Sequence, residues 1–471
     1  MLWFLEISNG TLFVYYLLSN LCYFVLLIVA LCTSAAHQRR IHSVRLDRMK
    51  LSPLMPPISL IAPAHNEEKS IVDSVESFLS INYPELEVIV VNDGSADSTL
   101  SKLQRHFELI PADIVYVNDV PCERIRGLYV SRSEPRLLVV DKESGGSKAG
   151  AVNAGLNAAS HPYVCVVDAD SILENDALLR IMVPVQNDPR RVVAAGGIVR
   201  VMNGSRVDHG RLREVRLPKS WLAVIQVIEY LRAFLIGREG WANFNLLLIV
   251  SGAFGVFRRD LVRQIGGFRS SAIGEDIDLV VRLHRHLLDQ GGGYHIHFVP
   301  DPVCWTEVPS DFRSLARQRA RWQKGSMDVL WKNRDMLFRP RYGTVGMFGL
   351  PYHWLFEMLS PLIEVVGYLT ILTAAFLGVL SRRFFIEFLL FGYAFATLIS
   401  IGSVLQEELT YKRYNAKRDV VRLILFCFLE HFPYRQLHMF WRLQGMWQYL
   451  RGDLIWKPMR RVGFESRPAG D

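Results

Sequence analysis

The sequence predicts an α/β domain with a mostly parallel sheet, inserted between transmembrane α-helices. Apolar runs carrying at most one charge lie near both ends of the chain, each long enough to cross a hydrocarbon core about 30 Å thick. In the middle, short β-branched runs alternate with helix-like stretches, the pattern of βαβ units. Basic residues gather beside the apolar runs, which is typical of the cytoplasmic flanks of membrane spans.

The composition excludes several classes of protein. The chain has 471 residues, which allows two or three domains, and half of its side chains are hydrophobic. That balance fits neither a collagen-like, a disordered nor a disulfide-rich chain. The six cysteines lie far apart and form no CxxC pair, so we expect neither a disulfide framework nor a zinc ribbon.

The N-terminal segment, residues 1–36, is predicted to form a retained transmembrane helix. Residues 11–32 carry no charge. A cleaved signal peptide would need a basic region before a shorter apolar core, yet no lysine or arginine precedes Arg39.

Residues 37–340 are predicted to form the cytoplasmic α/β domain. Its expected strands include 58–62, 88–91 and 164–167, and its expected helices include 66–80, 147–159 and 275–288. Residues 221–236 are apolar but too short to span a membrane, and they contain Glu229 and Arg232. We expect this stretch, and the basic stretch 311–333, to lie on the membrane or on the protein's own transmembrane bundle.

Residues 341–450 are predicted to form the C-terminal membrane region. Segments 359–380 and 384–405 are expected spans with one acid each. Residues 419–450 contain Pro433 and allow two readings, a broken hairpin that crosses the membrane or an interfacial pair of helices. Residues 451–471 are expected to form a cytoplasmic tail. The charge bias predicts a multi-pass protein of the cell inner (plasma) membrane with its catalytic domain in the cytoplasm.

The strongest chemical signal is an apolar strand that ends in Asp168 and Asp170. In open α/β sheets, ligands bind beyond the carboxyl ends of the strands. Two carboxylates one residue apart can hold a hard divalent cation, which can neutralise a leaving nucleoside diphosphate. An ordinary Asp-rich turn is the alternative reading.

Three further clusters follow predicted strands. In 89–99, the carboxylate of Asp93 could accept hydrogen bonds from a uracil or ribose edge. In 60–68, the polar residues His65, Asn66 and Glu67 open a helix. In 144–155, Lys148 begins a helix after glycines, where backbone N–H groups and an ammonium could seat a diphosphate.

These clusters resemble the nucleotide-sugar domain of family 2 glycosyltransferases, which has the GT-A fold. Three later motifs extend the resemblance to its processive polysaccharide synthases, which make poly-N-acetylglucosamine, cellulose and hyaluronan: SGAFGVFRRD at 251–260, GEDIDLVVRL at 274–283 and QRARW at 318–322. The resemblance covers residues 57–325 in the family's order. It implies Mg²⁺ or Mn²⁺ held by Asp168 and Asp170. The implied nucleotide-binding residues are Ala64, Asn66, Glu67, Asp93, Lys148, Asp168, Gln318 and Arg321.

The resemblance also implies catalytic roles. Asp276 would be the base that deprotonates the acceptor hydroxyl, with Glu275 next in line, whereas Asp278 is expected only to complement a helix N-terminus. Trp322 would be a platform for the acceptor sugar, and the implied acceptor-binding residues are Gly252, Ala253, Asp276 and Trp322. Residues 456–464 resemble a gating segment that closes over the nucleotide, with Trp456, Arg460 and Arg461 as its expected residues; a solvated basic tail is the alternative.

The predicted function is therefore an inverting, processive glycosyltransferase. It would transfer a hexose or N-acetylhexosamine, with UDP-GlcNAc or UDP-glucose favoured, to the non-reducing end of a β-linked exopolysaccharide and move the polymer across the membrane. Its predicted partners are the UDP-sugar, the growing polysaccharide, the lipid bilayer and accessory secretion subunits, with no nucleic acid. Two alternatives stay open: a non-processive transferase acting on a lipid carrier, and a catalytically silent envelope scaffold or receptor.

Overall fold

A ten-stranded mixed sheet forms the centre of the computed structural model, which describes residues 2–43, 46–208, 210–414 and 416–453. The strand order is β3-β4-β5-β2-β1-β6-β11-β8-β12-β7. The strands are β1 (Ile58–Ala64), β2 (Leu86–Asp93), β3 (Leu109–Pro111), β4 (Ile125–Ser131), β5 (Leu137–Lys142), β6 (Tyr163–Val167), β7 (Ile172–Leu173), β8 (Val192–Val201), β11 (Phe254–Arg258) and β12 (His295–Thr306); β9 (Arg206–Asp208) and β10 (Arg211–Glu214) pair separately.

The centre of the sheet is parallel, and this brings the predicted clusters to one edge. Strands β5, β2, β1 and β6 pair in parallel, with Ala64 beside Asn92 and Asp93 beside Lys142. Strand β11 runs antiparallel to β6, and Phe254 pairs with Val167, so the start of β11 lies at the same edge. The predicted α/β class is confirmed, with antiparallel strands on both sides of the parallel centre.

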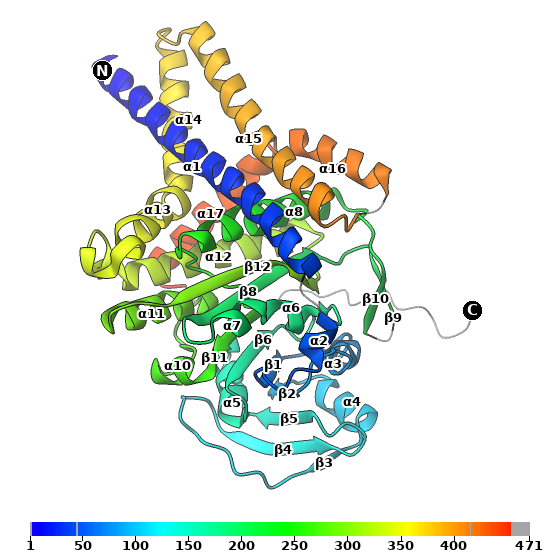
Figure 1. Ribbon diagram of the computed structural model, residues 1–471. Helices are drawn as coiled ribbons and strands as arrows, with labels where there is room; N and C mark the ends of the chain where they lie inside the picture. The colour runs from blue at the N-terminus through cyan, green and yellow to red at the C-terminus, as the bar shows by residue number, and fades with distance from the viewer. Residues whose placement is uncertain (1, 44–45, 209, 415, 454–471) are drawn as a thin grey trace.

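Helices cover both faces of this sheet, as the buried β-branched strands require (Figure 1). The helices and helical turns of the domain are α2 (Leu46–Lys50), α3 (Ile71–Leu79), α4 (Thr99–His106), α5 (Lys148–Ala158), α6 (Ala177–Ile181), α7 (Val183–Asn187), α10 (Arg259–Gln264), α11 (Glu275–Asp289), α12 (Phe312–Lys332), η2 (Arg334–Met336) and η3 (Pro340–Tyr342). Helix α5 lies close to the sheet because Gly155 has no side chain; a Cβ there would stand 2.4 Å from Ile61 Cγ2.

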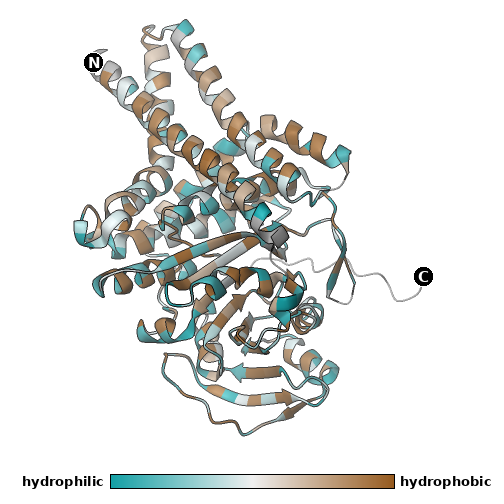
Figure 2. Ribbon diagram, viewed as in Figure 1, coloured by the Kyte–Doolittle hydropathy of each residue, from teal (hydrophilic) through white to brown (hydrophobic). Residues whose placement is uncertain are grey.

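Apolar helices project from the domain on the side of β12 (Figures 1 and 2). They are α1 (Leu2–Ser43), α14 (Ser360–Phe376) and α15 (Arg382–Thr410). Among the described residues, two helices are long and apolar enough to cross a membrane, Ile7–Arg39 and Phe385–Thr410. The N-terminal end of α1 and the turn between α14 and α15 lie on the same side of the molecule, away from the sheet (Figure 1).

The expected span at 359–380 takes a different form. Helix α14 is apolar enough only together with the preceding turns η4 (Val345–Gly349), α13 (Leu350–Tyr352) and η5 (His353–Met358), and the two parts meet at 48°. Pro361 occupies the first turn of α14. Because proline cannot donate a backbone hydrogen bond to the preceding turn, the helix breaks there. A third crossing therefore requires that this bent pair act as one span.

A buried helical layer joins the sheet to the apolar helices. It consists of α8 (Trp221–Leu231), η1 (Arg232–Arg238) and α9 (Glu239–Asn243). Helix α8 packs against β8 on one side and against α15 and α16 (Lys417–Leu429) on the other, and most of its residues are buried. The stretch expected at 221–236 thus lies on the protein's own helices.

The segment expected at 419–450 consists of two helices broken at Pro433, α16 (Lys417–Leu429) and α17 (Tyr434–Leu450). Helix α17 packs along α12 so closely that a Cβ at Gly445 would stand 2.4 Å from Ala320 O. Arg442 Nε also donates to Gln323 Oε1 at 2.8 Å. Neither helix is among those found long and apolar enough to span.

Candidate active site

Lys148 joins three of the predicted motifs at the carboxyl edge of the sheet. It is the first residue of α5, whose N-cap Ser147 accepts a hydrogen bond from Gly150 N. Its ammonium forms an ion pair with Asp168 after β6 and donates to Gly252 O at 2.9 Å. Glu275 Oε1 lies 3.9 Å from the same nitrogen. Three residues that are distant in the sequence therefore surround one cation.

The charges in this cluster alter one another's ionisation. Burial alone would lower the pKa of Lys148, but the carboxylates of Asp168 and Glu275 raise it, so the ammonium holds its proton. Burial raises the pKa of Glu275, and the neighbouring carboxylate of Asp276 adds to this, whereas Lys148 and Arg321 oppose it. An acid with a raised pKa beside a buried cation is typical of a reaction site.

Gly252 lets the motif at 251–260, the predicted acceptor loop, approach the predicted base. A Cβ at this position would stand 3.2 Å from Lys148 Nζ and 3.6 Å from Asp276 Cβ. A larger side chain would press on both groups. Ala253 follows and is nearly buried at the start of β11. The predicted acceptor loop and the predicted base are thus neighbours.

Two glycines allow α12, which contains QRARW, to approach the start of α11, which contains the predicted base. Glu275 and Asp276 are the first two residues of α11. A Cβ on Gly325 of α12 would stand 3.1 Å from Gly274 Cα, so the two backbones nearly touch there. Trp322, one helical turn before Gly325, is 44% exposed.

Gln318 and Arg321 lie on the same helix. Gln318 is buried, and its side-chain oxygen has no hydrogen-bond partner among the described residues. Arg321 is close enough to Glu275 to influence its pKa. A buried polar atom without a protein partner is a candidate ligand contact.

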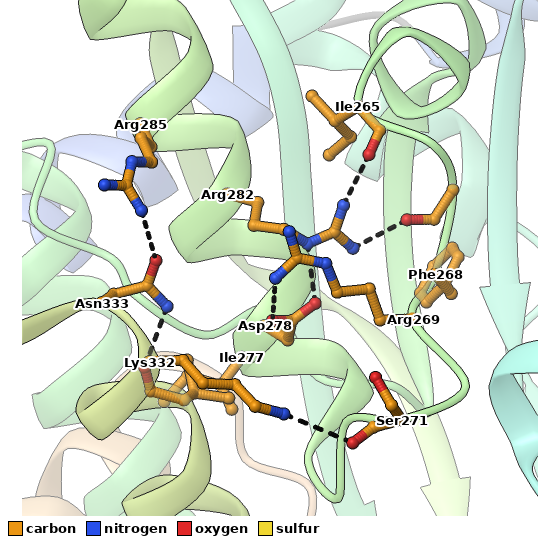
Figure 3. Close-up of polar contacts among 12 residues, drawn as sticks. Ile265, Phe268, Arg269, Ser271, Ile277, Asp278, Arg282, Arg285, Lys332 and Asn333 are labelled. Carbon is orange, nitrogen blue, oxygen red and sulfur yellow. Dashed lines mark hydrogen bonds and ion pairs between the residues drawn. The ribbon is translucent and has the colours of Figure 1, made fainter.

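The loop before α11 is held from both sides. Arg282 donates to the carbonyl oxygens of Ile265 and Gly267 and, at 2.7 Å, to Asp278 Oδ2 (Figure 3). Arg269 lies 3.6 Å from the other oxygen of Asp278. The expectation that Asp278 only complements a helix N-terminus is therefore wrong, because this carboxylate is fully buried between two guanidinium groups.

Asn153 fastens the same loop to α5. Its side-chain amide donates to Phe268 O and accepts from Phe268 N, both at 2.8 Å. Gly267 leaves room for this contact, since a Cβ there would stand 2.6 Å from Asn153 Oδ1. These hydrogen bonds hold α5, which begins at Lys148, in place relative to the start of α11.

The predicted nucleotide residues after β1 and β2 lie at the same edge, and several make structural contacts. Asn66 has a φ of 58°, and its backbone N–H donates to Ser95 Oγ. Glu67 N donates to Thr99 Oγ1. Ala64 is buried at the end of β1. These hydrogen bonds connect the turn after β1 to the turn after β2.

Asp93 has partners that the sequence reasoning missed. Its carboxylate pairs with Lys142 at the end of β5, whose ammonium is fully buried and also pairs with Glu123 at 2.7 Å. The Glu123 carboxylate lies against the glycine-rich turn, where a Cβ at Gly145 would overlap it. The sequence feature that could have indicated this pair is Lys142, a charged residue at the end of the apolar run 137–142. It marks a further cluster of polar residues at the end of a strand.

The two predicted metal ligands differ in exposure. The side chain of Asp168 is 32% exposed and paired with Lys148, whereas Asp170 is only 4% exposed. Within the part of the chain that the structure describes, no three His, Cys, Asp or Glu side chains are grouped as a metal would require.

The predicted gating residues Trp456, Arg460 and Arg461 lie outside the described residues. The last described residue before them, Asp453, lies beside α12, where its carbonyl oxygen accepts a hydrogen bond from Lys324 Nζ at 3.2 Å.

A mixed, mostly parallel sheet with a carboxylate pair, a basic helix start and an acidic helix start at one edge is consistent with a glycosyltransferase of the GT-A type. Residues 56–325 match the family described as "Glycosyltransferase like family 2", and the chain belongs to that family. The resemblance inferred from the motifs and the prediction of an enzyme are therefore confirmed.

Curated relatives carry a more specific name. The chain is 28% identical over 384 residues to a poly-beta-1,6-N-acetyl-D-glucosamine synthase of Staphylococcus epidermidis, covering 80% of this chain and 79% of the relative. It is 29% identical over 278 residues to the synthase of Staphylococcus aureus strain COL, covering 59% and 56%. A solved mannosyltransferase from Pyrobaculum calidifontis, in complex with GDP-Man and Mn²⁺, aligns with a TM-score of 0.49 and 20% identity, covering 86% of this chain and 98% of that one.

Proposed function

We propose that this protein is an inverting, processive polysaccharide synthase that uses a UDP-sugar. The observation that carries the proposal is the meeting of Lys148, Asp168, Gly252 and the Glu275–Asp276 pair at one sheet edge. The names of the curated relatives favour N-acetylglucosamine as the sugar and UDP-GlcNAc as the donor, with UDP-glucose second.

The proposed reaction needs one base and a stabilised leaving group. Asp276 takes the proton from an acceptor hydroxyl, whose oxygen forms a bond to the anomeric carbon from the side opposite the diphosphate. The bond from that carbon to the diphosphate breaks, and UDP leaves with the bonding electrons. Lys148 and Arg321 supply positive charge as the leaving group becomes more negative.

The carboxylates of Asp168 and Asp170 suit a Mg²⁺ or Mn²⁺ ion that shares its ligands with the donor. Magnesium is commonly bound by one or two carboxylates plus substrate phosphates, and this suits a strand end with two acids and no third side-chain ligand among the described residues. Bound there, the cation would neutralise the diphosphate. In this proposal Asp93, Asn66, Glu67 and Ala64 form the nucleoside side of the site.

Processive extension requires that the acceptor stay bound between transfers. We assign the acceptor platform to Trp322, whose flat apolar surface suits a pyranose ring. The apolar helices α1, α14 and α15 would supply a route for the polymer through the membrane, and the basic tail with Trp456, Arg460 and Arg461 would close over the nucleotide.

The proposed location is the inner membrane, with the catalytic domain in the cytoplasm. The basic flanks of the predicted spans support this orientation. The N-terminal end of α1 and the α14–α15 turn would then face outward together. Helices α16 and α17 would lie at the cytoplasmic interface, whereas accessory secretion subunits would receive the polymer on the outer side, near the α14–α15 turn.

The test is incubation of the purified protein in nanodiscs with radiolabelled UDP-sugars, one at a time, followed by sizing of the product. We expect long polymer from UDP-GlcNAc and release of one UDP per sugar added. A lipid-linked product carrying one sugar would favour the non-processive alternative. Absence of UDP release with every donor would favour the scaffold or receptor.

A further inference from the structure

Arg319, the second residue of the QRARW motif, forms an ion pair within the protein, so its charge is not directed at the diphosphate of a donor. It is buried on α12, and its guanidinium pairs with Glu229 of α8. The hydroxyl of Tyr434 on α17 donates to the same carboxylate oxygen of Glu229 at 2.9 Å. Three helices therefore meet at one ion pair, and the charge of Arg319 is compensated within the protein.

The same guanidinium covers one face of Trp322. Arg319 Cζ lies 4.4 Å from the centre of the indole ring, within the distance of a cation–π contact. The ring is nevertheless 44% exposed. The opposite face is thus the one available to a sugar.

Backbone packing alone does not orient this ring. The contact between Gly325 and Gly274 sets the backbone of α12 relative to Asp276, but a half-exposed tryptophan keeps its side-chain rotamers free. The buried guanidinium of Arg319, held by the carboxylate of Glu229, limits them. Since a displacement of about 1 Å in a reactant can cost roughly 10²-fold in rate, the direction of the ring matters for the acceptor that rests on it.

We propose that the Glu229–Arg319 ion pair fixes Trp322 as the acceptor platform, which makes Arg319 a positioning residue. This inference rests on the proposed function. It assigns the two arginines of QRARW separate roles, with Arg321 at the charged part of the site and Arg319 behind the tryptophan ring.

The kinetic test compares Arg319→Met, Glu229→Gln and the double variant with the wild type. We expect Arg319→Met to lower acceptor-dependent turnover about 10-fold or more, while the donor KM stays within about twofold and acceptor-free donor hydrolysis persists. The turnover of the double variant should be no lower than that of Arg319→Met alone, because both substitutions break the same ion pair. Arg317→Met, an exposed arginine on the same helix, is the matched control and should behave as the wild type.

A spectroscopic test reads the ring itself. In protein labelled with 5-fluorotryptophan, the ¹⁹F resonance of Trp322 is assigned by its loss in Trp322→Phe. We expect one narrow resonance in the wild type and in Arg317→Met, and a broadened or shifted one in Arg319→Met.

Two results would overturn the proposal. One is wild-type turnover with an unchanged resonance in Arg319→Met; the other is a parallel fall of donor binding, hydrolysis and thermal stability, which indicates a merely structural pair. If the wild type transfers no sugar from any donor, the proposed function fails, and the fluorine resonance still decides whether Arg319 orients the ring.

Discussion

At the scale of single residues, the candidate site depends on how charge is shared around Lys148. Its ammonium touches the carboxylate after β6 and the acceptor loop, and it faces the first acid of α11. A site with this many coupled charges is not optimised for stability, since buried carboxylates cost free energy unless they are fully paired. Each acid should therefore give a different result when it is neutralised.

Asp276→Asn should leave UDP-sugar binding near the wild-type value and lower transfer about 10²-fold or more, the usual scale of lost base catalysis. A titration with the donor measures UDP-sugar binding, and single-turnover kinetics measure transfer. Glu275→Asn serves as the comparison. Wild-type transfer by Asp276→Asn would move the base to Glu275.

Glu275→Gln should raise the melting temperature at pH 8, because the raised pKa of Glu275 means that its ionised form destabilises the folded state. The cost is present above the folded pKa and disappears as the pH falls toward the ordinary glutamate pKa of 4.5, because the wild-type carboxyl takes up its proton on the way. The advantage of the variant should therefore shrink on acidification. Melting curves of both proteins between pH 8 and 5 test this, with the exposed Glu143→Gln as control. A difference that does not depend on pH would contradict it.

Asp170→Asn should remove the metal-dependent part of UDP binding. Loss of an oxygen ligand is expected to lower the gain in UDP affinity from Mn²⁺ by about 10-fold or more. Calorimetric titration with UDP, with and without Mn²⁺, measures this gain. Asp113→Asn, on an exposed loop, is the control. An unchanged gain in a well-folded Asp170→Asn protein would refute the metal assignment.

At the scale of elements, the site depends on one close crossing of helices. Helix α12 approaches the start of α11 only because Gly325 and Gly274 meet without side chains. The loop before α11 is fastened to α5 by Asn153 and to α11 itself by Arg282. The proposed base and the proposed acceptor platform thus belong to separate helices whose spacing is set by backbone contact.

Gly325→Ala should separate these helices by a few tenths of an ångström, because its Cβ would stand 3.1 Å from Gly274 Cα. If about 1 Å costs roughly 10²-fold, transfer should fall about 3- to 10-fold with donor binding retained. Gly392→Ala in α15, where a Cβ meets nothing within 4 Å, should leave transfer unchanged. Equal rates for the two variants would mean that the crossing does not set the reaction geometry.

At the scale of the whole molecule, polar contacts fasten the apolar helices to the catalytic domain. Glu239 of α9 accepts hydrogen bonds from Thr33 and Ser34 of α1, at 2.9 and 2.8 Å. Arg200 of β8 pairs with Glu407 of α15, and both are almost fully buried. The sheet, the buried helical layer and the candidate spans are therefore one mechanical unit.

The proposed orientation can be read from thiol labelling in intact cells. In a chain with Cys32 and Cys122 replaced by serine, Arg382→Cys at the α14–α15 turn should react with a membrane-impermeant maleimide. Arg190→Cys, exposed on the catalytic domain, should react only after the membrane is opened. Labelling of Arg190→Cys in sealed cells would reverse the topology.

The sequence by itself determined the α/β class, the apolar helices at both ends and most of the candidate site. Asp168, Asp93 and Lys148 could be found because each follows an apolar run or opens a helix, and parallel strands bring their carboxyl ends to one edge. The break before Pro361 could not be placed, because a continuous apolar run does not reveal how its helix bends.

Only the tertiary structure decided which of these groups touch. The pairing of Arg319 with Glu229, 90 residues earlier, depends on how α12 crosses α8, and no local pattern contains that angle. The same holds for the buried pair of Asp93 with Lys142 and for the two guanidinium groups around Asp278. Periodicity and strand ends report local backbone preference, whereas an ion pair between distant elements forms only after packing has brought them together.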